Sequence, residues 1–315
     1  MDKPGLSLKQ GSPLIVIVGP TAVGKTEFSI QLARRFDGEI VSADSRLFYR
    51  GMDIGTAKPT TDQRLQVPHH LIDIAEPGEN LSLVDFQALA VKAIAEIHGR
   101  GRLPFLVGGT GQYIHAVIHG WKPPSSEPDI RLRSILEGLA DSRGKDWLHQ
   151  RLASLDPDSA NRIDARNLRR TVRALEVIFS TGRRFSEQRW HGDSPFRVLS
   201  IGITRSRPEL YARLDDRIET MFTAGLLEEV RQLLAKGISS DLPAMSAIGY
   251  RECTLVLRGD LSMEAAKIRM RKLTRIFVRR QANWFKLNDP EIHWFDAGQT
   301  RLEEIISMIH TFIEN

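Results

Sequence analysis

The chain has 315 residues, 41% of them hydrophobic and 26% charged, with a formal net charge of +5, which is ordinary for a soluble globular protein that buries a core. Its single cysteine, Cys253, cannot form an internal disulfide, no apolar run approaches about eighteen residues, and the polar N-terminus lacks a signal-peptide core. These features speak against a secreted or membrane-spanning protein, so we expect a cytoplasmic enzyme. The excess of basic over acidic residues is compatible with an anionic binding partner.

The first expected elements alternate between strand and helix. Residues 14–18 form a continuous apolar run rich in β-branched side chains, which is typical of a strand buried on both faces. An apolar residue at every fourth position predicts a helix over 26–36. A second strand over 39–43 ends at Asp44.

The same alternation continues with a helix over 83–98 and a buried strand over 103–107, which runs into a glycine-rich turn at 108–111. Strands that alternate with helices, each followed by a polar or glycine-rich turn, favour a parallel sheet with helices on its faces. The expected fold class is therefore α/β.

The pattern changes at 122–128, where prolines and serines predict a linker. Residues 130–189 are helical in pattern and rich in arginine, and a strand over 196–203 then restores the sheet. We therefore expect an inserted all-helical domain at 122–197, carried by a core of residues 1–121 and 198–315.

Helices are expected to dominate from Ser206 to the C-terminus. Ser206 is followed by Glu209 at capping-box spacing, with Pro208 in the first turn.

The eight residues that begin at Gly19 match the phosphate-binding pattern G-x-x-x-x-G-K-[ST], and they lie between an expected strand and an expected helix. Glycines let successive backbone N–H groups face an anion at the helix N-terminus, Lys25 adds a point charge, and the hydroxyl of Thr26 suits Mg²⁺. The sequence thus predicts a P-loop that binds a polyphosphate through Gly19, Thr21, Gly24, Lys25 and Thr26.

A P-loop alone does not identify the transferred group. The guanine-binding and switch motifs of GTPases are missing, but a small-molecule kinase stays open. Asp44 follows a strand at the edge of the sheet where ligands bind in open α/β folds. Considered alone, it is most simply a turn or capping aspartate.

Asp44 belongs to an ordered series of patterns: 42–45 read SADS, 49–59 read YRGMDIGTAKP, 68–73 read PHHLID, 108–111 read GGTG, 173–177 read RALEV, and 248–252 read IGYRE. Together with blocks at 225–230 and 274–285, this series resembles the tRNA dimethylallyltransferases, also called tRNA isopentenyltransferases. The resemblance covers about residues 14 to 286.

The resemblance implies a magnesium-dependent transfer of a dimethylallyl group from dimethylallyl diphosphate to the exocyclic amine of the adenosine immediately 3′ of the anticodon. Diphosphate is released. In this family pattern Asp44 would be the general base, while Thr110 and Arg217 would contact the diphosphate. Thr26 would be the metal ligand.

The implied partner is a tRNA anticodon stem-loop, held by the insertion and by Ser45, Arg275, Arg279, Arg280 and Gln281. The base would be splayed out of the loop into the pocket. We expect a monomer.

Basic residues at a spacing of four, Lys267, Arg271, Arg275 and Arg279, predict a phosphate-tracking stripe on one helix, with Leu273, Ile276 and Phe277 facing a core on its other side. Without the resemblance, a solvated helix face explains such a stripe as well.

Two other functions stay open at this point. One is prenyl transfer to a free adenine nucleotide, as in the adenylate isopentenyltransferases. The other is a nucleotide kinase or a P-loop module that binds RNA without catalysis.

Overall fold

The computed structural model describes residues 11–121, 124, 129–188, 192, 194–299 and 302–315. The chain divides into two compact units, one of residues 1–118 and 194–315 and the other of residues 119–193. The sequence placed these boundaries at 122 and 197. Most of the expected linker at 122–128 lies outside the described residues.

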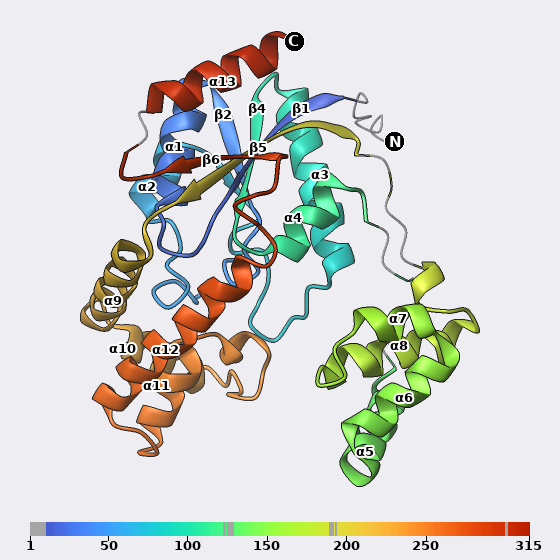
Figure 1. The fold of residues 1–315 in the computed structure, drawn as a ribbon. Helices are drawn as coiled ribbons and strands as arrows, with labels where there is room; N and C mark the ends of the chain where they lie inside the picture. Colours follow the sequence, from blue (N-terminus) through green and yellow to red (C-terminus); the bar gives the residue numbers. More distant parts are fainter. Residues whose placement is uncertain (1–10, 122–123, 125–128, 189–191, 193, 300–301) are drawn as a thin grey trace, which may run out of the picture. The chain divides into compact units, whose positions relative to one another are not determined.

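The first unit is built on a six-stranded sheet in the order β3-β2-β4-β1-β5-β6, in which every pair of neighbouring strands is parallel (Figure 1). The strands are β1 (Ser12–Val18), β2 (Gly38–Ser42), β3 (His69–His70), β4 (Leu103–Gly108), β5 (Phe196–Thr204) and β6 (Ile292–Asp296). The expected α/β class with a parallel sheet is confirmed.

Helices cover both faces of this sheet. The helices of the first unit are α1 (Lys25–Arg35), α2 (Thr61–Gln66), α3 (Leu83–Gly99), α4 (Gly111–Ile118), α9 (Arg207–Thr223), α10 (Leu226–Ala235), α11 (Tyr250–Leu257), α12 (Met263–Gln281) and α13 (Leu302–Glu314). Ile15 and Ile17 of β1 pack with α1 and α13 on one face, whereas Leu14 and Val16 pack with α3 on the other (Figure 1). Successive side chains of a strand point to opposite faces, so β1 is apolar throughout.

One strand beyond Ser206 was not expected from the sequence, and one cap differs from the expectation. The chain beyond Ser206 is not all helical, because β6 adds an edge strand next to β5, with Ser200 opposite Ile292. At the start of α9 the capping box is only half formed. Ser206 accepts the N–H of Glu209 at 3.4 Å, but the Glu209 carboxylate pairs with Arg205 at 2.5 Å instead of turning back to the cap.

A third apolar cluster lies beside the sheet, where α10 and α11 pack against the segment that follows β2. Tyr250 and Leu226 from the helices contact Met52 and its neighbours, and all three side chains are fully buried. This cluster fixes the segment 49–58 relative to α9 to α12.

The second unit is all helical in its described part, as expected, and its helices are α5 (Ile130–Arg143), α6 (Lys145–Leu155), α7 (Pro157–Arg162) and α8 (Leu168–Thr181). It has its own core around Leu136, Leu148, Leu152 and Leu175. Glu176, fully buried, is paired with arginines of α5 and α8. Across the described residues of both units, no helix is long and apolar enough to cross a membrane.

Candidate active site

The turn between β1 and α1 has the form that its sequence predicts. Gly19 and Gly24 have φ angles of 150° and 111°, in the region that disfavours other residues. A Cβ on Gly19 would lie 2.4 Å from the carbonyl oxygen of Ile203 in β5. Glycine at this position thus lets the loop pass directly over the end of the sheet.

Lys25 begins α1 and folds back over the loop. Its Nζ donates to the carbonyl oxygens of Gly19 and Pro20 at 3.0 and 2.9 Å. Burial lowers the pKa of Lys25 to about 8, the nearby carboxylate of Asp44 opposes this shift, and Arg217 adds to it. The ammonium therefore lies in a site with another cation and one carboxylate.

Asp44 follows β2 and closes a turn. Its Oδ1 accepts the N–H of Arg46 at 3.0 Å, the arrangement of an Asx turn. The guanidinium of Arg46 in turn donates to the carbonyl oxygen of Pro243 at 3.1 Å. The turn role considered from the sequence is thus real, and it fixes the carboxylate at the carboxyl edge of the sheet.

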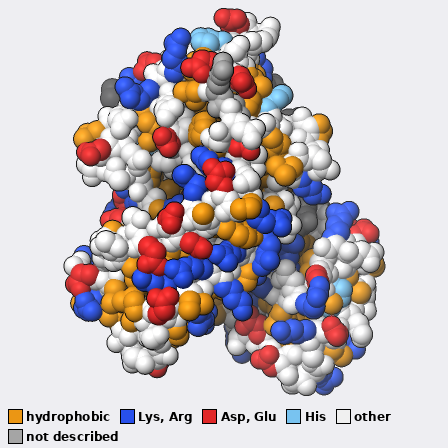
Figure 2. Space-filling view, turned by 60° about the vertical axis from the view of Figure 1, so that its left-hand side comes forward, with side chains coloured by type: hydrophobic (Ala, Val, Ile, Leu, Met, Phe, Trp, Pro, Cys, Tyr) orange, Lys and Arg blue, Asp and Glu red, His pale blue; other side chains and the backbone are white. Residues whose placement is uncertain are grey.

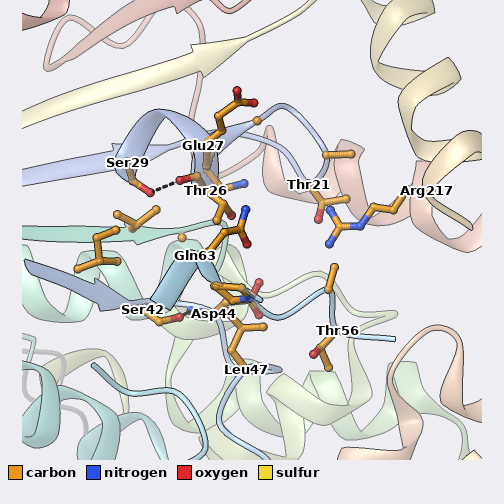
Figure 3. A pocket seen from close by; sticks show the side chains of 18 of the residues that line it. Thr21, Thr26, Glu27, Ser29, Ser42, Asp44, Leu47, Thr56, Gln63 and Arg217 are labelled. Atoms are coloured by element: carbon orange, nitrogen blue, oxygen red, sulfur yellow. Dashed lines mark hydrogen bonds between the residues drawn. The ribbon is translucent and has the colours of Figure 1, made fainter. Parts of the chain in front are cut away.

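Arg217 projects from α9 toward Thr21 and the interior of the pocket (Figure 3). Burial lowers the pKa of Arg217, Asp44 counteracts the shift, and Arg213 adds to it. Within the part of the chain that the structure describes, no ion pair neutralises the Arg217 guanidinium, so this desolvated cation is well placed to bind an anion.

Two cavities meet around these side chains. The first has a volume of about 530 Å³ and is lined by Lys25 and Thr26 of the P-loop, and the second, of about 490 Å³, is walled by apolar side chains of α9 and α12. Four residues line both cavities: Thr21, Asp44, Thr56 and Arg217. Asp44 and Arg217 therefore stand where a ligand in one cavity would reach a ligand in the other.

The apolar wall of the second cavity corrects one expectation. Leu273, Ile276 and Phe277 of α12 line this cavity, and Phe277 is 40% exposed, so they do not face a packed core. Their spacing indicated an apolar helix face, but periodicity alone does not distinguish a core from a cavity wall.

The basic stripe on α12 is also different from the expectation of a free phosphate-tracking surface. Lys267 and Arg271 pair with Glu219 of α9 at 2.6 and 2.5 Å, and Arg275 pairs with Asp215 at 2.6 Å. Figure 2 shows basic and acidic side chains next to one another on this side of the molecule. Acidic residues four apart on α9 thus neutralise much of the stripe.

The remaining RNA-binding candidates lie in different surroundings. Arg279 and Arg280 are exposed, and Arg280 also lines the second cavity, whereas Ser45 directly follows Asp44. Gln281 is only 6% exposed and is hydrogen-bonded inside the site. RNA contacts by Ser45, Arg275, Arg279, Arg280 and Gln281 stay predictions.

The glycine-rich turn after β4 lies close to the P-loop. Thr110 precedes α4, and its carbonyl oxygen accepts the N–H groups of Tyr113 and Ile114. Gly108 lines the first cavity, but Thr110 is not among the residues that line either of the two cavities. A diphosphate contact by Thr110 stays a prediction.

Sequence reasoning missed the residue that holds Thr56 in place. Glu229 of α10 accepts the N–H groups of Asp53, Ile54 and Gly55 at 2.8 to 3.3 Å. A Cβ on Gly55 would lie 2.4 Å from the ring of Tyr250. The available signal was only that 225–230 and 248–252 are among the segments of the resemblance, which does not reveal the partner.

Comparison with known proteins decides the family. A family model described as IPP transferase matches residues 47–288, and one described as isopentenyl transferase matches residues 12–70. The chain belongs to the IPP transferase family. It is a prenyltransferase of the tRNA dimethylallyltransferase group, as the sequence resemblance implied.

Similar proteins cover nearly the whole chain. The tRNA dimethylallyltransferase of Roseiflexus sp. (strain RS-1) is 53% identical over 87% of this chain and 90% of its own length, and that of Halalkalibacterium halodurans is 45% identical over 95% and 96%. The crystal structure of the tRNA isopentenylpyrophosphate transferase from Bacillus halodurans has a TM-score of 0.71 at 43% identity, covering 97% of this chain and 96% of that one. A eukaryotic dimethylallyltransferase acting on tRNA has a TM-score of 0.82 at 28% identity, covering 97% and 80%.

Proposed function

We propose that the protein transfers a dimethylallyl group from dimethylallyl diphosphate to the exocyclic amine of the adenosine immediately 3′ of the anticodon in tRNA and releases diphosphate. One observation carries this proposal. Asp44 and Arg217 line both the cavity at the P-loop and the apolar-walled cavity beside it. A donor diphosphate and an acceptor base can therefore meet at one carboxylate and one cation.

The diphosphate belongs in the first cavity. The N-terminus of α1, the ammonium of Lys25 and the guanidinium of Arg217 supply positive charge there. Lys25 would exchange its hydrogen bonds to Gly19 and Pro20 for phosphate oxygens. Cations fixed in a desolvated site stabilise the charge that develops on a leaving diphosphate.

The adenine belongs in the second cavity, which apolar side chains such as Ile248 and Phe277 line. A base that reacts inside a protein must leave its stack, and apolar surfaces receive it. Arg280 and Arg251 also line this cavity and carry charge suited to RNA phosphates.

The reaction balances without a protein nucleophile. The amine nitrogen forms a bond to the allylic carbon as the carbon–oxygen bond to the diphosphate breaks, and the diphosphate leaves with that electron pair. The proton of the amine passes to the Asp44 carboxylate. Because Oδ1 accepts the N–H of Arg46, Oδ2 is the oxygen available to the amine.

Magnesium fits the residues at this site. Within the described residues no group of three or more His, Cys, Asp or Glu could hold a metal ion, but Mg²⁺ is commonly bound by one or two protein oxygens together with substrate phosphates and water. The Thr26 side chain lines the first cavity beside Lys25 and would supply such an oxygen. When bound, the ion would neutralise charge on the departing diphosphate.

Three parallel incubations test the proposal. The purified protein is mixed with dimethylallyl diphosphate and tRNA, with dimethylallyl diphosphate and AMP, and with ATP and mononucleotides, each with Mg²⁺. We expect prenylated RNA only in the first, located by mass spectrometry of nuclease fragments at the adenosine 3′ of the anticodon. A tRNA with guanosine at that position is the matched control. Transfer to AMP at a comparable rate, or phosphoryl transfer, would reject the proposal.

A further inference from the structure

Gln281, the last residue of α12, connects two turns at the donor site. Its Oε1 accepts the backbone N–H of Thr21 in the P-loop at 2.9 Å, and its Nε2 donates to the carbonyl oxygen of Gly109 at 3.1 Å. The two partners lie 260 and 172 residues away in the sequence. One side-chain amide thus joins the turn after β1 to the turn after β4.

These contacts leave little space around the amide. Gln281 is 6% exposed, and a Cβ on Gly109 would lie 2.1 Å from its Nε2. Immediately beyond, a Cβ on Gly111 would lie 2.2 Å from the ring of Trp284. The end of α12 and the segment after it therefore pack directly on the glycine-rich turn.

Both ends of the Gln281 amide are used. Breaking its hydrogen bonds would leave a half-buried N–H on Thr21 and a buried carbonyl on Gly109 without these partners, which is costly. The second N–H and the second lone pair of the amide are not used by these two bonds, but at 6% exposure they have little access to an RNA on the surface. The Thr21 N–H points at Gln281, so the amide fixes the orientation of this peptide group of the P-loop.

We infer that Gln281 is a positioning residue for the diphosphate site and not a tRNA contact, an inference that rests on the proposed function for the identity of the donor. Its amide fixes the separation of the P-loop from the turn that carries Thr110. Because Gln281 ends the helix that carries Arg279 and Arg280, it also ties the diphosphate site to the helix that borders the base cavity.

The Gln281→Met variant tests this role, since methionine has a similar length and apolar volume but neither hydrogen bond. The matched control is Gln87→Met, because Gln87 of α3 also donates its amide to a backbone carbonyl, that of Ala116 at 2.7 Å, outside both cavities. Titration with inorganic diphosphate and Mg²⁺ is combined with measurements of tRNA affinity and of kcat and KM for each substrate.

We expect Gln281→Met to bind diphosphate about tenfold more weakly, as expected for the loss of roughly one net hydrogen bond, and to raise the donor KM. Its tRNA affinity should stay within about twofold of wild type, and Gln87→Met should change none of these quantities.

A double-mutant cycle provides a readout that a general loss of stability would not reproduce. Gly109→Ala places a methyl group on the Gln281 amide and should weaken diphosphate binding, whereas truncation in Gln281→Ala makes room for that methyl. The double variant should therefore bind diphosphate no more weakly than Gln281→Ala alone. Additive losses would show that the two positions act independently.

Two results would overturn the inference: wild-type diphosphate affinity in Gln281→Met, or a loss of tRNA affinity with diphosphate binding unchanged. Failure of the proposed function is distinguishable from both. It would appear as wild-type protein that transfers no prenyl group to tRNA, whereas the diphosphate titration would still report on Gln281.

Discussion

Tyr250 donates its phenolic hydrogen to the carboxylate of Glu229 at 2.5 Å, and the same carboxylate accepts backbone N–H groups from the segment that carries Thr56. Burial, followed by the nearby charge of Glu229, raises the pKa of Tyr250, so the phenol stays a donor at physiological pH. The pair thus stabilises the segment that carries Thr56, which lines both cavities, although neither Tyr250 nor Glu229 lines them.

Replacing this carboxylate should loosen that wall. We expect Glu229→Ala to lower the free energy of unfolding by about 2 kcal/mol, in the range for losing hydrogen bonds to a charged group. Glu228→Ala is the control, because Glu228 is exposed and its contacts, an ion pair with Arg231 and a hydrogen bond from Gln232 at 3.4 Å, lie on the surface of its own helix. Such exposed ion pairs are typically worth under about 1 kcal/mol. Chemical denaturation measures both. Equal losses would show that the hydrogen bonds of Glu229 add nothing.

The P-loop cation provides a second prediction, in the pH dependence of donor binding. Because the pKa of Lys25 in the free protein is lowered to about 8, the side chain is an ammonium below this pH and loses its charge above it. Affinity for the diphosphate should therefore fall as pH rises through about 8, by up to about tenfold per pH unit. Isothermal titration with inorganic diphosphate and Mg²⁺ between pH 6 and 10 measures this.

Lys25→Arg is the matched control for that titration, because arginine keeps its charge over the whole range. Any pH dependence that remains in Lys25→Arg belongs to groups other than Lys25, including diphosphate, whose own loss of protons should strengthen binding as pH rises. If wild type and Lys25→Arg show the same pH profile, the lowered pKa of Lys25 has no part in donor binding.

The elements nearest the P-loop could be predicted from sequence because their signals are local. Residues 14–18 and 103–107 are continuous apolar runs followed by glycine-rich turns, and they became β1 and β4. β3 has two residues, too few to show any periodicity. β6 is an edge strand whose side chains are largely half-buried, so it lacks the continuous apolar run of a central strand.

Some residues of the site could likewise be predicted from local sequence, and others could not. The glycines and Lys25 belong to the P-loop motif and Asp44 follows a strand, so local patterns identify them. Gln281 and Glu229 act on backbone groups 172 to 260 residues and 174 to 176 residues away. Nothing in a local pattern specifies such a partner, and the basic stripe was likewise overestimated because its acidic partners belong to another helix.

Removing the inserted unit is expected to separate donor binding from RNA binding. The described helices of residues 119–193 have their own core, and the strands of the sheet lie outside this segment. We expect a variant with residues 119–193 replaced by a short Gly-Ser linker to stay folded and to bind inorganic diphosphate, but to lose most of its tRNA affinity. Circular dichroism, diphosphate titration and filter binding of tRNA check these points. Retained tRNA affinity would exclude the insertion as an RNA-binding domain.

The catalytic role of Asp44 gives the sharpest test. In Asp44→Asn the amide oxygen can still accept the N–H of Arg46, so the turn should survive, but the charge that removes the amine proton is lost. General-base assistance is typically worth about 10² to 10⁴ in rate. We therefore expect single-turnover transfer to slow by roughly that factor while tRNA and donor still bind.

Asp289→Asn is the control for Asp44→Asn, because Asp289 makes the same kind of turn, accepting the N–H of Glu291 at 3.0 Å, on the surface and outside both cavities. It should leave the rate unchanged.

A metal-binding role for Asp44 predicts a different result: Asp44→Asn would bind Mg²⁺ more weakly, and excess Mg²⁺ would partly restore the transfer rate. A turn role alone predicts a nearly silent substitution, since asparagine and aspartate serve equally well in such turns. A transfer rate within about threefold of wild type would therefore reject Asp44 as the general base, because it lies well below the expected effect.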